Sequence, residues 1–464
     1  MKVYDEPSCR YSAPVLNPIH KCLPLRLTSL RLPAQVDPWT TDRYLDLPRD
    51  SGPRGLSARA RPRLVPERII GVNDRSSKAI LNSVGGVVSA MATFASVLGA
   101  AGMVAVGPLS AASAQVIALP PELVTDPDLS AEELAQVRAF IDEHAPALLR
   151  SADREKLKAA RLALVTPLAN PAASAPFRIG MAAALDPTLT QMMVAKEDLL
   201  VINALVISGE LATPTALSRL TAALSNEKEE IRYQAAYGLR RAFLAMQGGT
   251  PAVRSDQADD AITAIGNQLA REEDAIVIDG LVAAGLAAIG VDRHRNIGIT
   301  QVSVGLIANT RAAGANVRGE AYANALLRAC SGVRDALGKP GGAAAPTAAK
   351  QAAELAGAVI AHARKVVQAS KLPTTSQGGD KIPAVREGYA QAIGAASQLL
   401  QLAGTTLNAN ARLTLPDLVR SLRAGTVQAD TQFALDAETI VGGGAGVPAL
   451  ARPPFEFPAN HFVR

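Results

Sequence analysis

Residues 225–246, SNEKEEIRYQAAYGLRRAFLAM, constrain the fold of this chain most, because their apolar positions recur on one helical face. These positions are Ile231, Ala235, Leu239, Ala242, Phe243 and Met246. Glutamates crowd the first turn while Arg240 and Arg241 lie further along, which matches the direction of the helix dipole. Asn226 is placed to cap the start, with Glu229 at the capping-box position. The stretch therefore predicts one amphipathic helix.

Two further stretches share its design, with an acidic start, an aliphatic pair and a small residue at the centre. The three related stretches are residues 196–211, 228–243 and 272–286. Aligning Ala204, Ala236 and Gly280 gives spacings of 32 and 44 residues. Residues 214–224 and 256–270 lie between them and are predicted to be second helices. Helix pairs at irregular periods in the thirties and forties are typical of HEAT or armadillo-type repeats, and the small central residues permit close stacking.

On these residues the chain resembles the HEAT-repeat family over about residues 196–313, roughly a quarter of its length. The resemblance implies an all-α fold, namely an α-solenoid of HEAT-like helix pairs with additional C-terminal helices. In that family the position held here by Arg232 often joins polar contacts between repeats. The matching positions in this chain are Leu200 and Ile276, so a regular polar ladder is not expected.

Composition agrees with an all-helical array. Of the 464 residues, 48% are hydrophobic but only 3% are aromatic, so alanine, leucine and valine must do most of the packing. Such small side chains suit closely packed helices better than sheets. A chain of this length holds two or three compact domains or one long repeat array. The helical segments outside the repeats are expected in residues 115–195 and 314–425.

Residues 76–114 predict a bacterial export signal. Residues 79–121 carry no charge and directly follow a short basic stretch. The apolar run ends in the small-x-small pattern that signal peptidase cleaves, with the cut expected between Ala114 and Gln115. This interpretation places the mature protein in the periplasm or outside the cell.

The main alternative is a retained anchor, because residues 79–106 are long enough to span the inner membrane. Residues 1–75 are rich in Pro, Arg, Asp and Ser and predict a disordered basic leader. Signal peptides begin near a start codon. We therefore hypothesise that the native start lies downstream, for example at Val72, and that this leader is not part of the native protein.

Charge and motif content argue against several function classes. Residues 1–78 carry 14 Lys and Arg against 8 Asp and Glu, which leaves 33 basic and 34 acidic residues in the rest of the chain. A near-neutral body with few aromatic residues does not favour a nucleic-acid partner. The cysteines Cys9, Cys22 and Cys330 have no disulfide or metal spacing, and Cys330 is expected to be a core residue. The five histidines are scattered singly, so we expect no metal, no cofactor and no small-molecule substrate.

Residues 426–464 form a Gly- and Pro-rich tail that holds three of the rare aromatic side chains. These are Phe455, Phe457 and Phe462. We expect the rings to dock back onto the helices and cap the last repeat. A partner-binding peptide and plain disorder are the alternatives.

These observations predict an exported, non-enzymatic scaffold that offers a helical surface to another protein. The candidate partner-binding residues are Arg232, Tyr233, Tyr237, Arg240 and Arg241, because Arg and Tyr are enriched at interface hot spots. The scaffold interpretation also predicts a concave groove lined by second helices such as residues 214–224 and 256–270. The alternatives are a self-associating structural component of the envelope and an accessory subunit of an enzyme.

Overall fold

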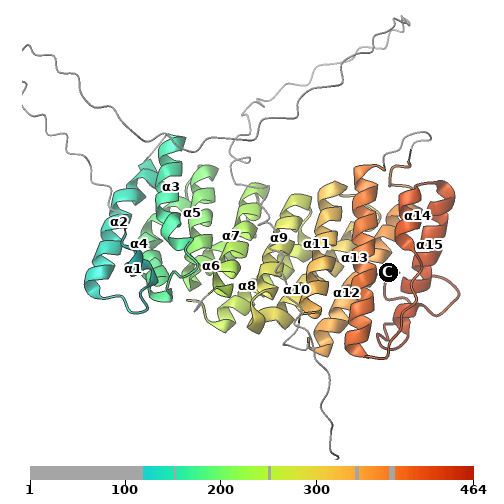
Figure 1. Ribbon diagram of the computed structural model, residues 1–464. Coiled ribbons are helices and arrows are strands. Elements are labelled where there is room, and N and C mark those ends of the chain that lie inside the picture. The colour runs from blue at the N-terminus through green and yellow to red at the C-terminus, as the bar shows by residue number, and fades with distance from the viewer. Residues whose placement is uncertain (1–118, 151–152, 249–251, 340–343, 376–381, 464) are drawn as a thin grey trace, which may run out of the picture. The chain divides into compact units, whose positions relative to one another are not determined.

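The computed structural model describes residues 119–150, 153–248, 252–339, 344–375 and 382–463 (Figure 1). All of them belong to one unit, Ala105–Arg464. Every regular element in these ranges is a helix, which confirms the all-α class. The predicted leader, the signal segment with Ala114 and Gln115, and the alternative anchor over residues 79–106 lie outside the described residues.

The helices vary in length from short turns to long core helices. In chain order they are α1 (Pro121–Thr125), α2 (Ala131–Arg150), α3 (Arg154–Leu168), α4 (Ala175–Met193), α5 (Asp198–Leu211), α6 (Pro214–Ala223), α7 (Glu229–Gln247), α8 (Ser255–Arg271), α9 (Ala275–Ile289), the 3₁₀ helix η2 (Asp292–His294), α10 (Arg295–Ala313), α11 (Gly319–Leu337), α12 (Pro346–Gln368), α13 (Ala384–Leu407), α14 (Leu418–Ala424), α15 (Val427–Val441) and the 3₁₀ helix η3 (Ala449–Ala451).

Helices two apart in the sequence pack side by side and form two layers. The first layer runs α5, α7, α9, α11 and α13, and the second runs α6, α8, α10, α12 and α15. Consecutive helices, such as α5 with α6 and α8 with α9, join the layers. A helix inside either layer therefore shares its apolar face with a preceding neighbour, a following neighbour and a helix of the other layer.

The predicted helix pairs are confirmed as helices. Residues 196–211, 228–243 and 272–286 correspond to α5, α7 and α9, and α6 and α8 are the helices between them. The predicted cap of α7 is wrong. The cap position is Lys228, and the Asn226 Oδ1 atom accepts a hydrogen bond from the Lys228 backbone N–H at 2.9 Å. Asn226 lies two residues before the cap position, so its side chain closes the turn before the helix rather than the helix itself.

Two pairs of glycines bring neighbouring helices into backbone contact. A Cβ atom on Gly209 of α5 would lie 2.7 Å from the Gly238 Cα atom of α7. In the second layer, a Cβ atom on Gly305 of α10 would lie 2.5 Å from the carbonyl oxygen of Gly266 of α8. Neither crossing leaves room for a side chain, so glycine is required at these points.

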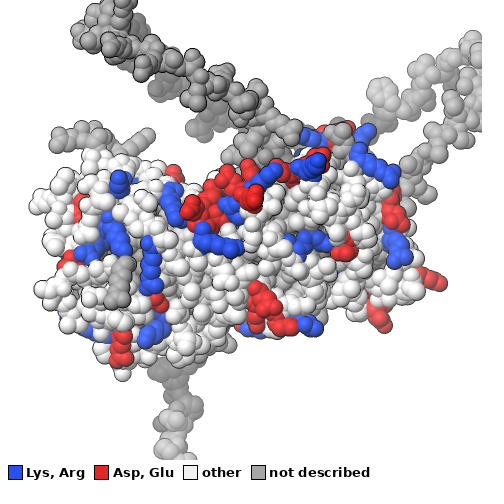
Figure 2. Space-filling view, turned by 180° about the vertical axis from the view of Figure 1, so that it is seen from behind, with Lys and Arg blue, Asp and Glu red and all other residues white. Residues whose placement is uncertain are grey.

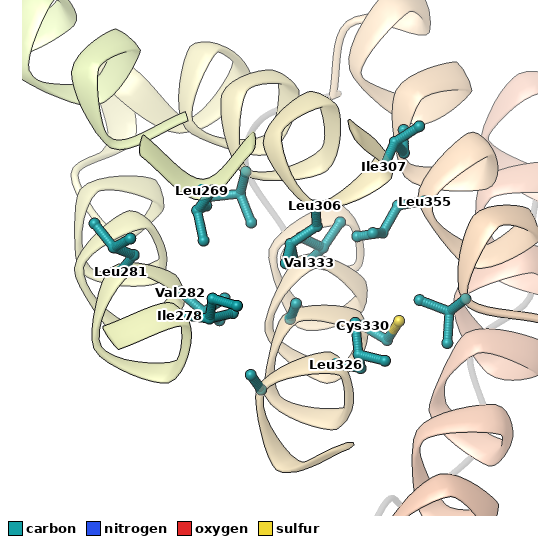
Figure 3. Close-up of a cluster of buried hydrophobic side chains, with 14 of the residues drawn as sticks. Leu269, Ile278, Leu281, Val282, Leu306, Ile307, Leu326, Cys330, Val333 and Leu355 are labelled. Carbon is teal, nitrogen blue, oxygen red and sulfur yellow. The ribbon is translucent and has the colours of Figure 1, made fainter. Parts of the chain in front are cut away.

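The core is apolar and divides into two clusters that meet at α5. Val201 and Leu205 of α5 belong to the larger cluster, whereas Ala204 and Ile207 belong to the smaller cluster built on α1–α4. Figure 3 shows part of the larger cluster, where side chains of α8 to α12 converge. Cys330 of α11 lies inside it, fully buried, as expected for a small core residue.

Within the described ranges, no single helix has the length and apolar character needed to cross a membrane. The bent pair Ala275–Ile289 and Asp292–Ala313, which meets at 112°, passes the same test of length and composition.

The C-terminal phenylalanines dock onto the helices, as predicted. Phe455, Phe457 and Phe462 are 1%, 6% and 5% exposed. The predicted Gly- and Pro-rich tail over residues 426–464 starts later than expected, because Val427–Val441 form α15, and its rings dock elsewhere than at the end of the last repeat. The tail turns back along α12, and Phe462 and Leu450 lie against Gly357 in the middle of that helix.

Candidate partner-binding surface

Arg232, the first of the predicted partner-binding residues, is engaged within the chain. Its Nε and Nη2 atoms each donate to a carboxylate oxygen of Glu272 at 2.8 Å. Its Nη1 atom donates to the backbone carbonyls of Asn226 and Glu227. The guanidinium therefore ties the start of α7 to the end of α8 and makes one polar contact of the kind that the HEAT resemblance implies.

Arg241 points toward a different helix. Its Nε and Nη2 atoms bond both carboxylate oxygens of Glu210 on α5, at 2.7 and 3.0 Å. Tyr233 packs its ring against Gly280 of α9, where a Cβ atom would lie 3.2 Å from the ring. Tyr237 and Arg240 are half-buried on the same helix. The five predicted residues thus share α7, but Arg232, Arg241 and Tyr233 are held by α8, α5 and α9 respectively. Partner binding by this face stays a prediction.

Glu272 is the centre of a buried polar network that joins α8 to the following helices. Besides Arg232, it accepts a hydrogen bond from the Gln268 Nε2 atom at 2.8 Å. Burial raises the pKa of the Glu272 carboxyl, but the hydrogen bonds from Arg232 and Gln268 outweigh burial and leave the pKa below its usual value. Asn309 of α10 donates to the backbone carbonyls of Leu269 and Glu272 at 2.8 and 2.7 Å.

The network continues through Asn309 into α11. The Oδ1 atom of Asn309 accepts hydrogen bonds from the Arg318 Nη1 atom and the Tyr322 hydroxyl, both at 3.0 Å. The guanidinium of Arg318 also lies 5.5 Å from the centroid of the Tyr322 ring. Such fully paired polar groups fix which helices adjoin and are costly to break.

His362 of α12 is another buried polar side chain that bonds to neighbouring helices. Its Nδ1 atom lies 2.9 Å from the Gly314 carbonyl oxygen, and its Nε2 atom lies 2.9 Å from the Tyr389 hydroxyl. Since a carbonyl only accepts, the N–H belongs on Nδ1 and the hydroxyl donates to Nε2. Burial lowers the pKa of His362 to about 4, and the charges of Arg318 and Lys365 act in the same direction. The neutral imidazole of His362 therefore joins α10, α12 and α13 through hydrogen bonds.

The second layer presents an exposed outer face over α6, α8 and α10, which pack side by side in that order. We call it the second-layer face. Its exposed side chains include Thr215, Ser218, Asp256, Asp260, Asn267, Val304 and Arg311. The face is polar with mixed charge, and Val304 of α10 is 45% exposed on it. On the side of the molecule drawn in Figure 2, acidic side chains gather in one patch near the upper middle with basic side chains beside it, and smaller charged groups are scattered elsewhere.

The second-layer face ends at α12, where a segment of the chain itself is seated. Residues 447–463, which we call the C-terminal hook, lie along a stripe of α12 made by residues four, three and four apart. The stripe consists of Lys350, Glu354, Gly357 and Ala361. A Cβ atom on Gly357 would lie 2.7 Å from both Phe462 and Leu450. The absence of a side chain there makes the socket into which the hook fits.

Polar contacts hold the edges of the hook. The Nε2 atom of His461 lies 2.6 Å from the Glu354 Oε1 atom of α12 and 3.1 Å from the Arg311 Nη2 atom of α10. The Lys350 ammonium lies 5.4 Å from the centroid of the Phe457 ring. The hook therefore recognises α12 through both ring packing and charge, and it reaches the edge of the second-layer face at Arg311.

The buried Cys330 and His294 side chains are part of the packed core. Burial raises the pKa of the Cys330 thiol to about 12, which keeps it protonated and inert. His294 is fully buried and pairs its Nδ1 atom with the Asp259 carboxylate at 2.7 Å. Among the residues that the structure describes, no three His, Cys, Asp or Glu side chains are grouped so as to hold a metal ion.

Comparison with protein-family models gives no match, and comparison with curated proteins gives none either. The arrangement itself is thus the basis for assigning a function. The socket on α12 was not predicted from the sequence. The usable signal was Gly357, a single glycine in the middle of an otherwise alanine-rich helical stretch.

Proposed function

We propose that this chain is a HEAT-like α-solenoid that acts as a non-enzymatic scaffold and binds a partner protein on the second-layer face. One observation carries the proposal: the chain's own hook is seated on the outer surface of α12, the next helix of the same layer. A compact, turn-rich protein segment is therefore a ligand that this layer takes at α12. Helical-repeat proteins commonly use such continuous surfaces for recognition.

The charge and the chemistry of the molecule support a protein partner. The second-layer face mixes Asp260, Asn267 and Arg311 with the apolar Val304, which is the composition of a protein contact rather than of a polyanion track. The buried His294, His362 and Cys330 have structural surroundings that account for them.

Site-specific photo-crosslinking in the native cell tests the proposal with a matched pair of positions. Val304 on the second-layer face and Ile276 on the first layer are 45% and 44% exposed, so a crosslinking residue fits equally at both. We expect protein adducts from position 304 and none from position 276. Adducts from position 276 alone would place the partner on the first layer, beside Tyr233 and Tyr237, and would refute the second-layer assignment.

We further propose that the protein is exported in a bacterium and acts in the cell envelope. The support is the uncharged run over residues 79–121 and the expected cleavage between Ala114 and Gln115. N-terminal sequencing of the protein from its native cell should give a mature start at Gln115. A start upstream of residue 79 would favour the retained anchor.

A further inference from the structure

The C-terminal hook is a self-contained piece of structure. Its backbone N–H groups bond carbonyls of the hook itself, as in Phe457 to Leu450 at 2.9 Å and His461 to Pro458 at 2.9 Å. Phe457 also lies between two other hook rings, with centroids 6.4 Å from Phe455 and 5.6 Å from Phe462. The conformation of the hook is therefore fixed largely by its own contacts and travels with it.

Its attachment to α12 uses side chains that fill a preformed socket. Phe462 and Leu450 fill the space above Gly357, and His461 bonds Glu354 and Arg311. The socket lies on the regular surface of a 23-residue helix that is packed against α10, α13 and α15. It does not depend on the hook for its backbone geometry.

The connection between the hook and α15 has the character of a hinge. Residues 442–446 have the sequence GGGAG, and residues 443–447 are exposed. Gly442 and Gly443 have φ angles of 97° and 107°, which only glycine adopts readily. Arg364 donates to the Gly442 carbonyl at 2.8 Å and to Glu438 at 2.6 Å. Gly443 and Gly444 still pass close to the Arg364 and Glu438 side chains, so the pivot falls at the exposed residues 445–447.

We propose that the hook is an exchangeable ligand and that the α12 socket takes the hook of a second copy of this chain. Hook and socket are complementary whichever chain each belongs to, so exchange replaces every contact by an identical one. Only the hinge residues change conformation. Reciprocal exchange joins two copies into a symmetric pair and leaves the second-layer face over α6 and α8 open in both.

The proposal goes beyond the proposed scaffold function and does not depend on it. A chain that binds its partner on the second-layer face as a monomer retains that function without exchange. A chain that exchanges hooks and binds no partner would be a self-associating component instead. The crosslinking experiment tests the scaffold function and the complementation experiment below tests hook exchange, so a negative result in one does not contradict the other proposal.

Complementation between two full-length variants tests exchange. The first carries Phe457→Ala and Phe462→Ala, which spoil its hook and leave its socket intact. The second carries Gly357→Leu, which fills its socket and leaves its hook intact. Neither can dock its hook in its own socket. We expect each variant alone to be a monomer by light scattering and an equimolar mixture to give a 1:1 complex of twice the monomer mass.

Two controls accompany the complementation experiment. Gly357→Ala replaces Gly357→Leu if the larger side chain prevents folding, because a Cβ atom alone already meets Leu450 and Phe462 at 2.7 Å. The parent chain has hook, socket and hinge unchanged, and a mixture that contains it in place of the socket variant shows how far cis docking competes. If both variants are folded by circular dichroism and their mixture stays monomeric at the highest soluble concentration, exchange is ruled out.

Discussion

At the scale of single residues, the interior is organised by a few polar groups with complete sets of partners. Glu272, Asn309 and His362 each join helices that are distant in the sequence. A buried polar group without a partner costs free energy, whereas a fully paired one specifies which helices must meet. These residues therefore select one arrangement among the many that alanine-rich helices permit.

The first prediction concerns Glu272, whose side chain is 2% exposed beside Arg232 at 16%. Glu272→Gln leaves a buried guanidinium without its counter-charge and should lower the free energy of unfolding by about 3 kcal/mol. Asp279→Asn is the matched control, because Asp279 pairs with Arg328 at the surface, with side chains 30% and 46% exposed. That change should cost less than about 1 kcal/mol. Urea unfolding at neutral pH measures both, and equal losses would show that burial of the pair has no energetic role.

The second prediction is a pH dependence from His362. Its pKa is about 4 in the folded chain, below the ordinary value of 6.5. The unfolded chain therefore binds a proton at this residue between pH 6.5 and pH 4 while the folded chain does not, so stability is lost as the pH falls through this window. The loss attributable to His362 should reach about 3 kcal/mol.

Urea unfolding between pH 7 and pH 4 checks this, with His362→Gln as the comparison. The amide can bond Gly314 and Tyr389 but does not titrate, so the variant should lose less stability over the window than the parent protein. The window for Glu272 lies lower, because its pKa is depressed and its contribution is lost only as the pH drops below about 4.5. Parallel pH curves for the parent and His362→Gln would contradict the assignment.

At the scale of helices, glycine crossings set how closely neighbours approach. The Gly209–Gly238 contact holds α5 against α7, and the Gly266–Gly305 contact holds α8 against α10. Backbone contact at these points lets short side chains elsewhere along the pair fill the remaining space. A composition with 3% aromatic residues can then still reach native packing density.

The third prediction follows from these crossings. Gly209→Ala places a methyl group 2.7 Å from the Gly238 backbone and should destabilise the chain by about 1–3 kcal/mol. Gly394→Ala is the control, because its added atom meets Val419 at an ordinary 3.4 Å. Higher helix propensity should make that variant up to about 1 kcal/mol more stable. Thermal unfolding of both variants measures the difference, and stabilisation by Gly209→Ala would show that the crossing tolerates a side chain.

Periodicity was sufficient to predict the helices but not their partners. The 3.6-residue pattern of α7 shows which side of that helix is apolar, and that side is buried as expected, whereas α5 and α9 were predicted from their similarity to it. The partner of Arg232 lies forty residues further along, and its identity depends on which helices adjoin. The partner-binding role of Arg232 and Arg241 was predicted from the sequence of their own helix alone. Their carboxylate partners, Glu272 and Glu210, become visible only in the folded chain.

At the scale of the whole described unit, stability should be local. Each helix packs against a few neighbours, and the two core clusters share only the region around α5. In arrays built this way, neighbour interactions dominate and distant parts can open independently.

The fourth prediction uses one fully buried leucine in each cluster. Leu164→Ala in α3 and Leu326→Ala in α11 each remove about 2–5 kcal/mol of local packing. Hydrogen exchange followed by mass spectrometry should show faster exchange in α2–α4 for the first variant and in α9–α13 for the second. If either change accelerates exchange throughout the described helices, the unit unfolds as one cooperative block instead.

The seat of the hook on Gly357 also has a consequence for synthesis on the ribosome. Gly357 and Leu450 are about 90 residues apart, so at the usual rate of translation the stripe of α12 stays bare for roughly 5 to 20 s. A chain that folds as it is exported therefore carries an unfilled socket until its own hook follows, and finished copies on the same side of the membrane carry hooks that fit it. Pairing between copies would then depend on how fast each chain crosses the membrane as well as on protein concentration.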